Sequence, residues 1–226
     1  ASKRIMQHKK EVMVSCFSKE GFMQVVNETN IKYLKVASMD ANNIEILNYL
    51  KELDETYKIF ISTGMCEEKD VNKIVEIMKK AKARIILMQC TSSYPAPTEE
   101  INLKSLIYYK EIMPKDWDLG FSDHTYGDAA MVASVHYDVK YIEKHVTLSK
   151  YMRGPDHYQS LTPEEIKEVK KKIEQNMTLQ GRKKKEIQIS EYETWISQKK
   201  NRRRKKLKNQ IKEEDDNTFS NGDLQE

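Results

Sequence analysis

Short runs of apolar residues alternate with longer amphipathic stretches over most of the chain. The runs carry Val, Ile, Leu and Phe without a polar face, which is typical of parallel β-strands covered by helices. The stretches between them repeat apolar residues at helical spacing, as in residues 67–83, where Val71, Ile74 and Val75 are apolar. The pattern therefore predicts successive strand–helix units.

Six such units follow one another along the chain. The predicted strands are residues 11–15, 33–37, 58–62, 84–90, 119–122 and 140–145. The predicted helices are residues 19–28, 43–53, 67–83, 101–113, 127–136 and 163–177. The last helix has a strong start signal, because Thr162 precedes Pro163 and Glu165 completes a capping box.

Polar residues lie where the predicted strands end. A hydroxyl, lysine or histidine stands at or just beyond each carboxyl end: Ser15, Lys35, Ser38, Ser62, Ser92, Ser122, His124 and His145. In a doubly wound sheet, function gathers at the one point where the strand order reverses. In a barrel, every strand faces one axis and can contribute to one site. The sequence therefore predicts an α/β fold, a partial TIM-type (β/α) barrel of six units.

Composition divides the chain into residues 1–180 and residues 181–226. Apolar residues make up 38% and charged residues 33% of the whole, which is low and high for a globular protein. Much of this bias lies between Arg182 and Lys208, where twelve Lys or Arg accompany three Glu. We expect this charged tail to be mostly disordered, with at most one helix.

The basic run from Arg202 to Lys208 raises the alternative of nucleic-acid binding through phosphate contacts. An acidic run, residues 213–216, follows it directly, and no stacking aromatics are interleaved. We therefore expect a solvated tail and no nucleic-acid partner.

Cysteine usage and hydropathy bear on the compartment. Cys16, Cys66 and Cys90 are odd in number and far apart, and no signal peptide is evident. These features predict reduced thiols in a cytoplasmic protein. No apolar run approaches the roughly 18 residues that a membrane span needs, so we expect no membrane partner.

Two histidines are the most informative candidates for chemistry. His124 and His145 each follow a predicted strand, and the two strands are consecutive. Neighbouring strand ends place such side chains close enough to share a divalent metal. Asp156 and His157 follow His145 within a dozen residues. A lone histidine or serine at a strand end is more often structural, and Asp156 also suits a turn, so the whole set carries the argument.

Seven motifs, in order, closely resemble the sialic acid synthases. They are Lys35-Val36-Ala37-Ser38, Ser62-Thr63-Gly64-Met65, Gln89-Cys90-Thr91-Ser92-Ser93-Tyr94-Pro95, Asn102-Leu103, Gly120-Phe121-Ser122-Asp123-His124-Thr125, Ile142-Glu143-Lys144-His145 and Gly154-Pro155-Asp156-His157. The resemblance covers about residues 11–177. Enzymes of this family condense phosphoenolpyruvate with N-acetylmannosamine or a related N-acetylated amino sugar and release phosphate.

The resemblance implies roles for named residues. Phosphoenolpyruvate, which needs cations and hydroxyl donors, is expected at Lys35, Ser38, Ser62, Ser92 and Ser122, with Ser15 where the family usually has threonine. His124 and His145 correspond to the ligands of a divalent metal, Mn²⁺ or Mg²⁺, which activates the sugar aldehyde. Tyr94 and Asp156 correspond to sugar contacts, and Asp40 to an acidic residue suited to proton transfer.

The chain also departs from the family pattern. No match exists to the family's first two βα units, and residues 199–224 resemble the linker and first turn of its antifreeze-like domain only faintly. We therefore expect a truncated synthase with little or no activity alone, and a possible homodimer. The alternative is a non-catalytic remnant that acts as an interaction protein through its charged tail.

Overall fold

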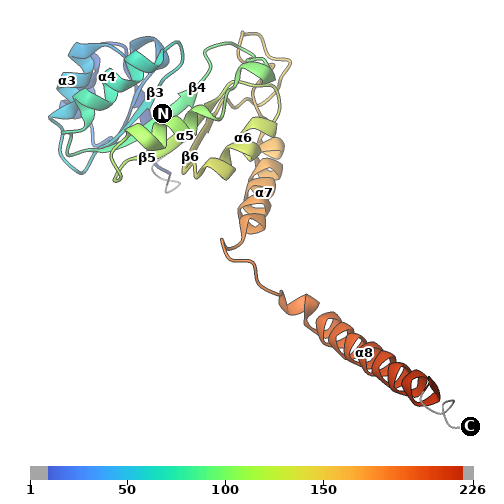
Figure 1. Ribbon diagram of the computed structural model, residues 1–226. Helices are drawn as coiled ribbons and strands as arrows, with labels where there is room; N and C mark the ends of the chain where they lie inside the picture. Colours follow the sequence, from blue (N-terminus) through green and yellow to red (C-terminus); the bar gives the residue numbers. More distant parts are fainter. Residues whose placement is uncertain (1–9, 221–226) are drawn as a thin grey trace, which may run out of the picture. The chain divides into compact units, whose positions relative to one another are not determined.

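The computed structural model describes residues 10–220, and for residues 213–220 it describes the backbone alone. The main elements, in chain order, are β1 (Met13–Ser15), α2 (Lys19–Glu28), β2 (Tyr33–Val36), α3 (Ile44–Lys51), β3 (Lys58–Ser62), α4 (Glu68–Met78), β4 (Arg84–Cys90), α5 (Ser105–Ile112), β5 (Asp118–Asp123), α6 (Ala129–Ser134), β6 (Tyr141–Lys144), α7 (Pro163–Gln180) and α8 (Tyr192–Ser220). A helix follows each strand along the chain, and Figure 1 labels β3 to β6 with the helices that follow them. The six predicted strand–helix units are all present.

The six strands form one parallel sheet in the order β1-β2-β3-β4-β5-β6. The order follows the sequence without reversal, so the sheet has no switch point of the doubly wound kind. Sequential parallel strands joined by helices are the arrangement of a (β/α) barrel. The predicted partial barrel is confirmed as a half-barrel of six strands.

Contacts between distant strands show that the sheet curls. Lys35 on β2 forms an ion pair with Glu143 on β6, although these strands are four positions apart in the sheet. At a spacing of about 4.8 Å per strand, a flat sheet would separate them by roughly 19 Å. The rings of Phe60 on β3 and Tyr141 on β6 also meet, with centroids 5.2 Å apart. Both contacts therefore cross the interior of the curl.

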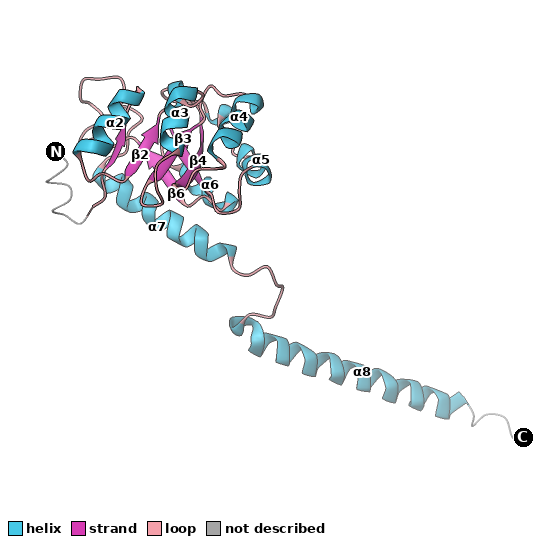
Figure 2. Cartoon of the chain, turned by 90° about the vertical axis from the view of Figure 1, so that its left-hand side faces the viewer, coloured by secondary structure: helices cyan, strands magenta, loops and turns pink. Residues whose placement is uncertain are grey.

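Two apolar layers lie on the two faces of the sheet. The larger core joins the strands to α2, α3, α4 and α5, and its fully buried members include Phe22, Leu34, Leu47, Ile59 and Ile74. Figure 2 shows these helices gathered around the strands. A smaller cluster on the inner face contains Phe60, Ile86 and Met88, with Tyr33 and Tyr141 against it. This arrangement explains why the strands carry apolar residues on both faces.

Element boundaries differ from the sequence prediction where the backbone leaves helical conformation. The helix predicted over residues 101–113 begins only at Ser105, because Asn102 has a φ of 46°, outside the right-handed helical region. The capping box before α7 is confirmed: Thr162 N donates to Glu165 Oε2 over 2.9 Å, and Glu165 N to Thr162 Oγ1 over 3.4 Å.

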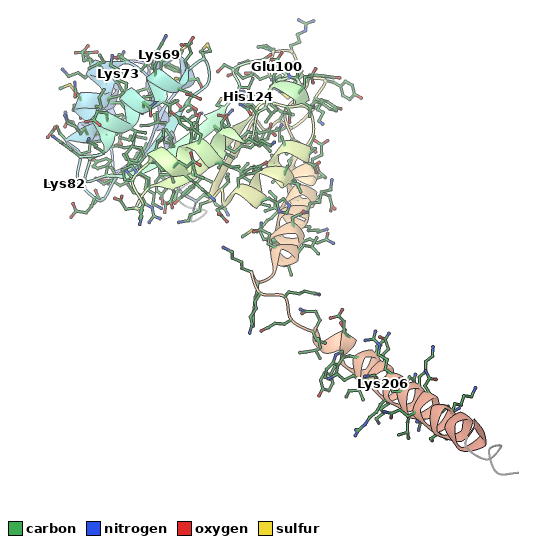
Figure 3. The ribbon with its side chains drawn as sticks, viewed as in Figure 1. Lys69, Lys73, Lys82, Glu100, His124 and Lys206 are labelled. Carbon is green, nitrogen blue, oxygen red and sulfur yellow. The ribbon has the colours of Figure 1, made fainter. Side chains whose placement is uncertain are left out.

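The chain divides into two compact units, Ala1–Gln180 and Gly181–Glu226. The second unit contains the single long helix α8, and its described side chains, such as Lys206, are exposed apart from a half-buried Ile196 (Figure 3). The described side chains of the tail therefore form no core. Its helix takes up more of the segment than the sequence suggests, because Lys, Arg, Gln and Glu are good helix formers.

None of the helices within residues 10–220 combines the length and the apolar composition that crossing a membrane requires.

Candidate active site

The predicted site residues lie at one end of the half-barrel. Ser15 and Ser62 are the last residues of β1 and β3, and His124 and His145 directly follow β5 and β6. The remaining candidates come from the same strand ends or from the loops that follow them: Lys35, Ser38, Asp40, Ser92, Tyr94, Ser122 and Asp156. Figure 3 labels His124 in this region. Parallel strands present their carboxyl ends together, so one rim collects these side chains.

Lys35 and Ser122 meet at a shared carboxylate. The Lys35 ammonium pairs with Glu143 Oε1, and Ser122 Oγ donates to the same oxygen over 3.0 Å. The Lys35 and Glu143 side chains are 13% and 22% exposed, so the pair is largely shielded from water. An ammonium and a hydroxyl that converge on one anionic group form a site for an anion.

Glu143 is a functional candidate to which the sequence motifs assign no role. In its motif, Glu143-Lys144-His145, a role is predicted for the histidine alone. The signal that could have found it is strand alternation, because Glu143 and His145 are two residues apart and share a face of the strand.

A second group of hydroxyls surrounds Gly64, the second residue after β3. Gly64 N donates to Ser38 Oγ over 3.1 Å, and Ser38 Oγ donates to Cys90 Sγ over 3.4 Å. A Cβ at Gly64 would lie 2.2 Å from Ser92 Oγ and 2.8 Å from Ser38 Oγ. Ser92 Oγ is buried and has no hydrogen-bond partner among the described residues. The absence of a side chain at Gly64 thus lets two hydroxyls approach each other.

The histidines form an aromatic cluster with Tyr94. The His124 and His145 ring centroids are 5.3 Å apart, and the Tyr94 ring lies 4.2 Å from the first and 5.8 Å from the second. His145 Nδ1 lies 3.8 Å from Asp156 Oδ2. The structure therefore brings together four of the predicted residues.

Hydrogen bonding fixes the tautomer of His124. Its Nδ1 lies 2.8 Å from the carbonyl oxygen of Thr91, which can only accept, so Nδ1 carries the proton. In the neutral ring, Nε2 then keeps a lone pair, which is the arrangement common among metal-ligating histidines.

The two imidazoles differ in pKa. Burial, followed by the charge of His124, lowers the pKa of His145. Burial also lowers the pKa of His124, but Cys90 and the Thr91 carbonyl raise it by more, so that its net pKa is raised. The Cys90 thiol shows the matching change: burial raises its pKa, and hydrogen bonds with His124 and Ser38 bring the net pKa below its usual value.

Three predicted residues are not joined to these groups. Ser15 is exposed, and the Ser62 hydroxyl donates a hydrogen bond to Met88 Sδ over 3.9 Å. Asp40 Oδ2 is buried and has no hydrogen-bond partner in the part of the chain that the structure describes. Their places at the same rim are compatible with the predicted roles, which stay predictions.

The loop after β4, which carries Ser92 and Tyr94, is held by a buried polar network. Tyr109 Oη lies 2.7 Å from Thr63 Oγ1 and donates to Gln89 Oε1 over 2.9 Å. Gln89 Nε2 in turn donates to the Ile101 carbonyl over 3.0 Å. Burial raises the pKa of Tyr109 to about 12, so its hydroxyl stays protonated. A cavity of about 670 Å³ borders this network and reaches Cys90 and Ser92.

Comparison with known proteins agrees with this geometry. The NeuB family pattern matches residues 2–185, which is most of the chain. The chain belongs to the NeuB family.

Relatives of this NeuB-family chain include proteins named as sugar-acid synthases. It is 34% identical over 187 residues to N,N'-diacetyllegionaminic acid synthase of Campylobacter jejuni, an alignment that covers 80% of this chain and 55% of the relative. It is 33% identical over 151 residues to human N-acetylneuraminate-9-phosphate synthase, covering 67% of this chain and 41% of the relative. The chain spans about half the length of the curated relatives it matches.

A solved structure has the same fold. The N-acetylneuraminic acid synthetase of Leptospira borgpetersenii, in complex with citrate, superposes with a TM-score of 0.78 at 27% identity. The match covers 89% of this chain and 69% of that protein. The half-barrel therefore corresponds to part of a NeuB-type barrel.

Proposed function

We propose that this chain forms the substrate-binding rim of a nonulosonic acid synthase, which condenses phosphoenolpyruvate with N-acetylmannosamine or a related amino sugar. The observation that carries the proposal is that the predicted site residues share one end of the half-barrel. There, Lys35 of β2 and Ser122 of β5 converge on Glu143 of β6, the strand that His145 directly follows, and His145 lies beside His124. The citrate bound by the Leptospira protein, a polycarboxylate, supports an anion site in this family.

Phosphoenolpyruvate would occupy the hydroxyl-rich part of the rim. Lys35 neutralises a carboxylate or phosphate oxygen, and Ser122 donates to it once Glu143 releases both groups. Ser38 and Ser92 lie side by side at Gly64, where two hydroxyls can donate to one further anionic oxygen. Ser15 and Ser62 complete the ring of donors at the ends of β1 and β3.

The residues present fit a divalent cation. Two imidazoles, with Asp156 near His145, offer nitrogen and oxygen donors, a set that suits Mn²⁺ better than the oxygen-preferring Mg²⁺. Among the side chains that the structure describes, within residues 10–212, no three from His, Cys, Asp or Glu are grouped for an ion. His124 and His145 would therefore hold the ion, and its other coordination positions would be open. When bound, the ion polarises the aldehyde oxygen of the open-chain sugar.

The remaining residues orient the sugar and move protons. Tyr94 lies against both histidines and Asp156 beside His145, so both are placed to contact the sugar. The enol carbon of phosphoenolpyruvate bonds to the aldehyde carbon, and water adds at the neighbouring carbon. Asp40, with its unpartnered oxygen among the described residues, carries the proton from that water toward the former aldehyde oxygen. The bond between the hydrated carbon and its phosphate oxygen then breaks, and phosphate leaves.

Two measurements on the 226-residue chain test this proposal. Calorimetric titration with phosphoenolpyruvate is expected to show binding that Lys35→Met weakens strongly. Phosphate release is then measured with phosphoenolpyruvate, N-acetylmannosamine and Mn²⁺, with His124→Ala as the control. Release that needs both substrates and disappears in the control supports the synthase function. A chain that binds no phosphoenolpyruvate contradicts it.

The alternative function is an interaction protein that acts through its charged tail. The observation in its favour is that the described side chains of residues 181–212 are nearly all exposed. A chain that ends at Gln180 separates the two functions: the synthase proposal expects it to bind phosphoenolpyruvate as the full chain does, because the named site residues all precede Gly181.

A further inference from the structure

A buried ion pair lies beside the two histidines. Lys144 Nζ is 2.8 Å from Asp123 Oδ2, and these side chains are 4% and 0% exposed. Asp123 directly precedes His124, and Lys144 directly precedes His145. The sheet register also pairs the two residues, because Asp123 stands opposite Lys144 where β5 and β6 end.

Strand alternation places this pair on the face opposite the histidines. Tyr141 packs with the inner cluster of the half-barrel, whereas Ile142 packs with Leu161 and Val169 on the helix side. Continuing the alternation from Tyr141 puts Glu143 and His145 on the inner face and Lys144 on the outer face. On β5, Ser122 reaches Glu143 on the inner face, so Asp123 lies on the outer face with Lys144.

The pair binds the backbone turn that carries His124. Asp123 Oδ1 accepts from Thr125 N over 2.9 Å, and Lys144 Nζ donates to the Thr125 carbonyl over 2.5 Å. The ammonium on β6 therefore contacts the chain on both sides of His124. The carbonyls of the histidines are held as well, since Ala96 N donates to that of His124 and Leu161 N to that of His145, each over 2.9 Å.

A charge pair is a costly way to fill a buried position. Desolvating an ammonium and a carboxylate offsets much of their attraction, and apolar residues of similar volume often stabilise as well or better. Unlike an apolar contact, an ion pair with hydrogen bonds depends on orientation. It therefore favours one register of the two strand ends. Here those hydrogen bonds join the turn that carries His124 to the strand end that precedes His145.

We propose that Asp123 and Lys144 are positioning residues that set the separation of the His124 and His145 imidazoles for a shared divalent ion. The inference rests on the metal site of the proposed function. It assigns a purpose to two buried charges that lie on the outer face of the sheet, opposite the residues proposed to bind the sugar and phosphoenolpyruvate. Groups that orient metal ligands in this way typically change metal affinity about 10- to 100-fold when removed.

The test compares four variants of the full chain. Asp123→Asn and Lys144→Met each leave one buried charge unpaired, and the double variant Asp123→Asn/Lys144→Met leaves none. Asp118→Asn is the matched control, because Asp118 is a buried carboxylate at the other end of β5, bound by Arg84 and Lys140. For each variant, urea unfolding gives stability, electron paramagnetic resonance gives Mn²⁺ affinity, and nuclear Overhauser effects between the histidine ring protons give their proximity.

We expect both single variants to lose stability and the double variant to regain part of the loss, while its Mn²⁺ affinity stays at least about tenfold below wild type. The nuclear Overhauser effect between the ring protons of His124 and His145 is expected to weaken in parallel. The control should lose stability without either change. If the double variant fails to fold, Asp123→Asn, which is nearly isosteric and can keep the Thr125 bond, is compared with the control instead.

Mn²⁺ affinity that simply follows stability across all the variants, the control included, would overturn the proposal, as would a double variant that binds Mn²⁺ like wild type. A wild-type chain that binds no Mn²⁺ would remove the metal site from the proposed function. The ring-proton effect in the metal-free chain would then decide alone whether the pair sets the histidine separation.

Discussion

Lys35 on β2 and Glu143 on β6 form an ion pair across the interior of the half-barrel. The pair joins strands that are four positions apart in the sheet, so it can form only because the sheet curls. Ser122 donates to the same Glu143 oxygen. In the structure, a protein carboxylate thus holds the cation and hydroxyl that an anionic substrate needs.

The first prediction concerns the competition between Glu143 and an anionic substrate for Lys35. Glu143→Gln removes the charge that holds Lys35 and repels an anion, so phosphoenolpyruvate should bind about tenfold more tightly, or roughly 1.4 kcal/mol. Calorimetric titration measures the affinity. Glu76→Gln, the same charge change at an exposed position of α4, should leave it unchanged. Unchanged or weaker binding in Glu143→Gln would show that Glu143 does not compete for Lys35.

The second prediction concerns the hydroxyls at Gly64. Gly64→Ala places a methyl group 2.2 Å from Ser92 Oγ and 2.8 Å from Ser38 Oγ, so at least one hydroxyl must move. We expect weaker phosphoenolpyruvate binding and a loss of about 1–3 kcal/mol in unfolding free energy. Gly21→Ala on α2, where the closest atom would be 3.3 Å away, is the control and should keep the affinity. Equal affinity in both variants would count against an anion site at Gly64.

The sheet and its barrel character could be predicted because apolar runs and polar strand ends are local patterns. The strands Lys58–Ser62 and Arg84–Cys90 match the prediction at both ends. The contact between Glu143 and Lys35 could not be predicted from the sequence, because whether these residues, 108 apart, meet depends on how far the sheet curls. The start of α5 was missed for a different reason: the positive φ of Asn102 reflects its loop, not its helix propensity.

The third prediction concerns acid stability at the other end of β5. Burial raises the pKa of Asp118, but Arg84 and Lys140 lower it by more, so the net pKa lies below its usual value. A carboxyl with a depressed folded-state pKa stabilises the fold above its unfolded pKa of about 3.9, and this contribution is lost as pH falls through the folded-state value.

Asp118→Asn should therefore lower the unfolding free energy at pH 7 by about 1–2 kcal/mol. The loss is no larger because the half-exposed cations Arg84 and Lys140 can be solvated by water instead. At pH values below the folded-state pKa the difference from wild type should shrink. Urea unfolding at several pH values measures both effects. A difference that stays constant with pH would mean that the Asp118 charge is not the source of the stability.

The last prediction separates two adjacent tyrosines on α5. Tyr109 Oη bridges Thr63 and Gln89, and Gln89 holds the Ile101 carbonyl. Tyr109→Phe leaves Gln89 Oε1 without its donor in a buried place, which should cost about 1–3 kcal/mol of unfolding free energy. Because the network supports the loop that carries Ser92 and Tyr94, substrate binding should weaken as well.

Tyr108→Phe is the matched control for this network. The Tyr108 hydroxyl is buried but has no hydrogen-bond partner among the described residues, so its removal relieves a desolvated group and should be neutral or stabilising. Thermal unfolding and phosphoenolpyruvate titration of the two variants give the comparison. Equal losses at both positions would show that tyrosine packing, and not the Thr63–Tyr109–Gln89 network, supports the loop after β4.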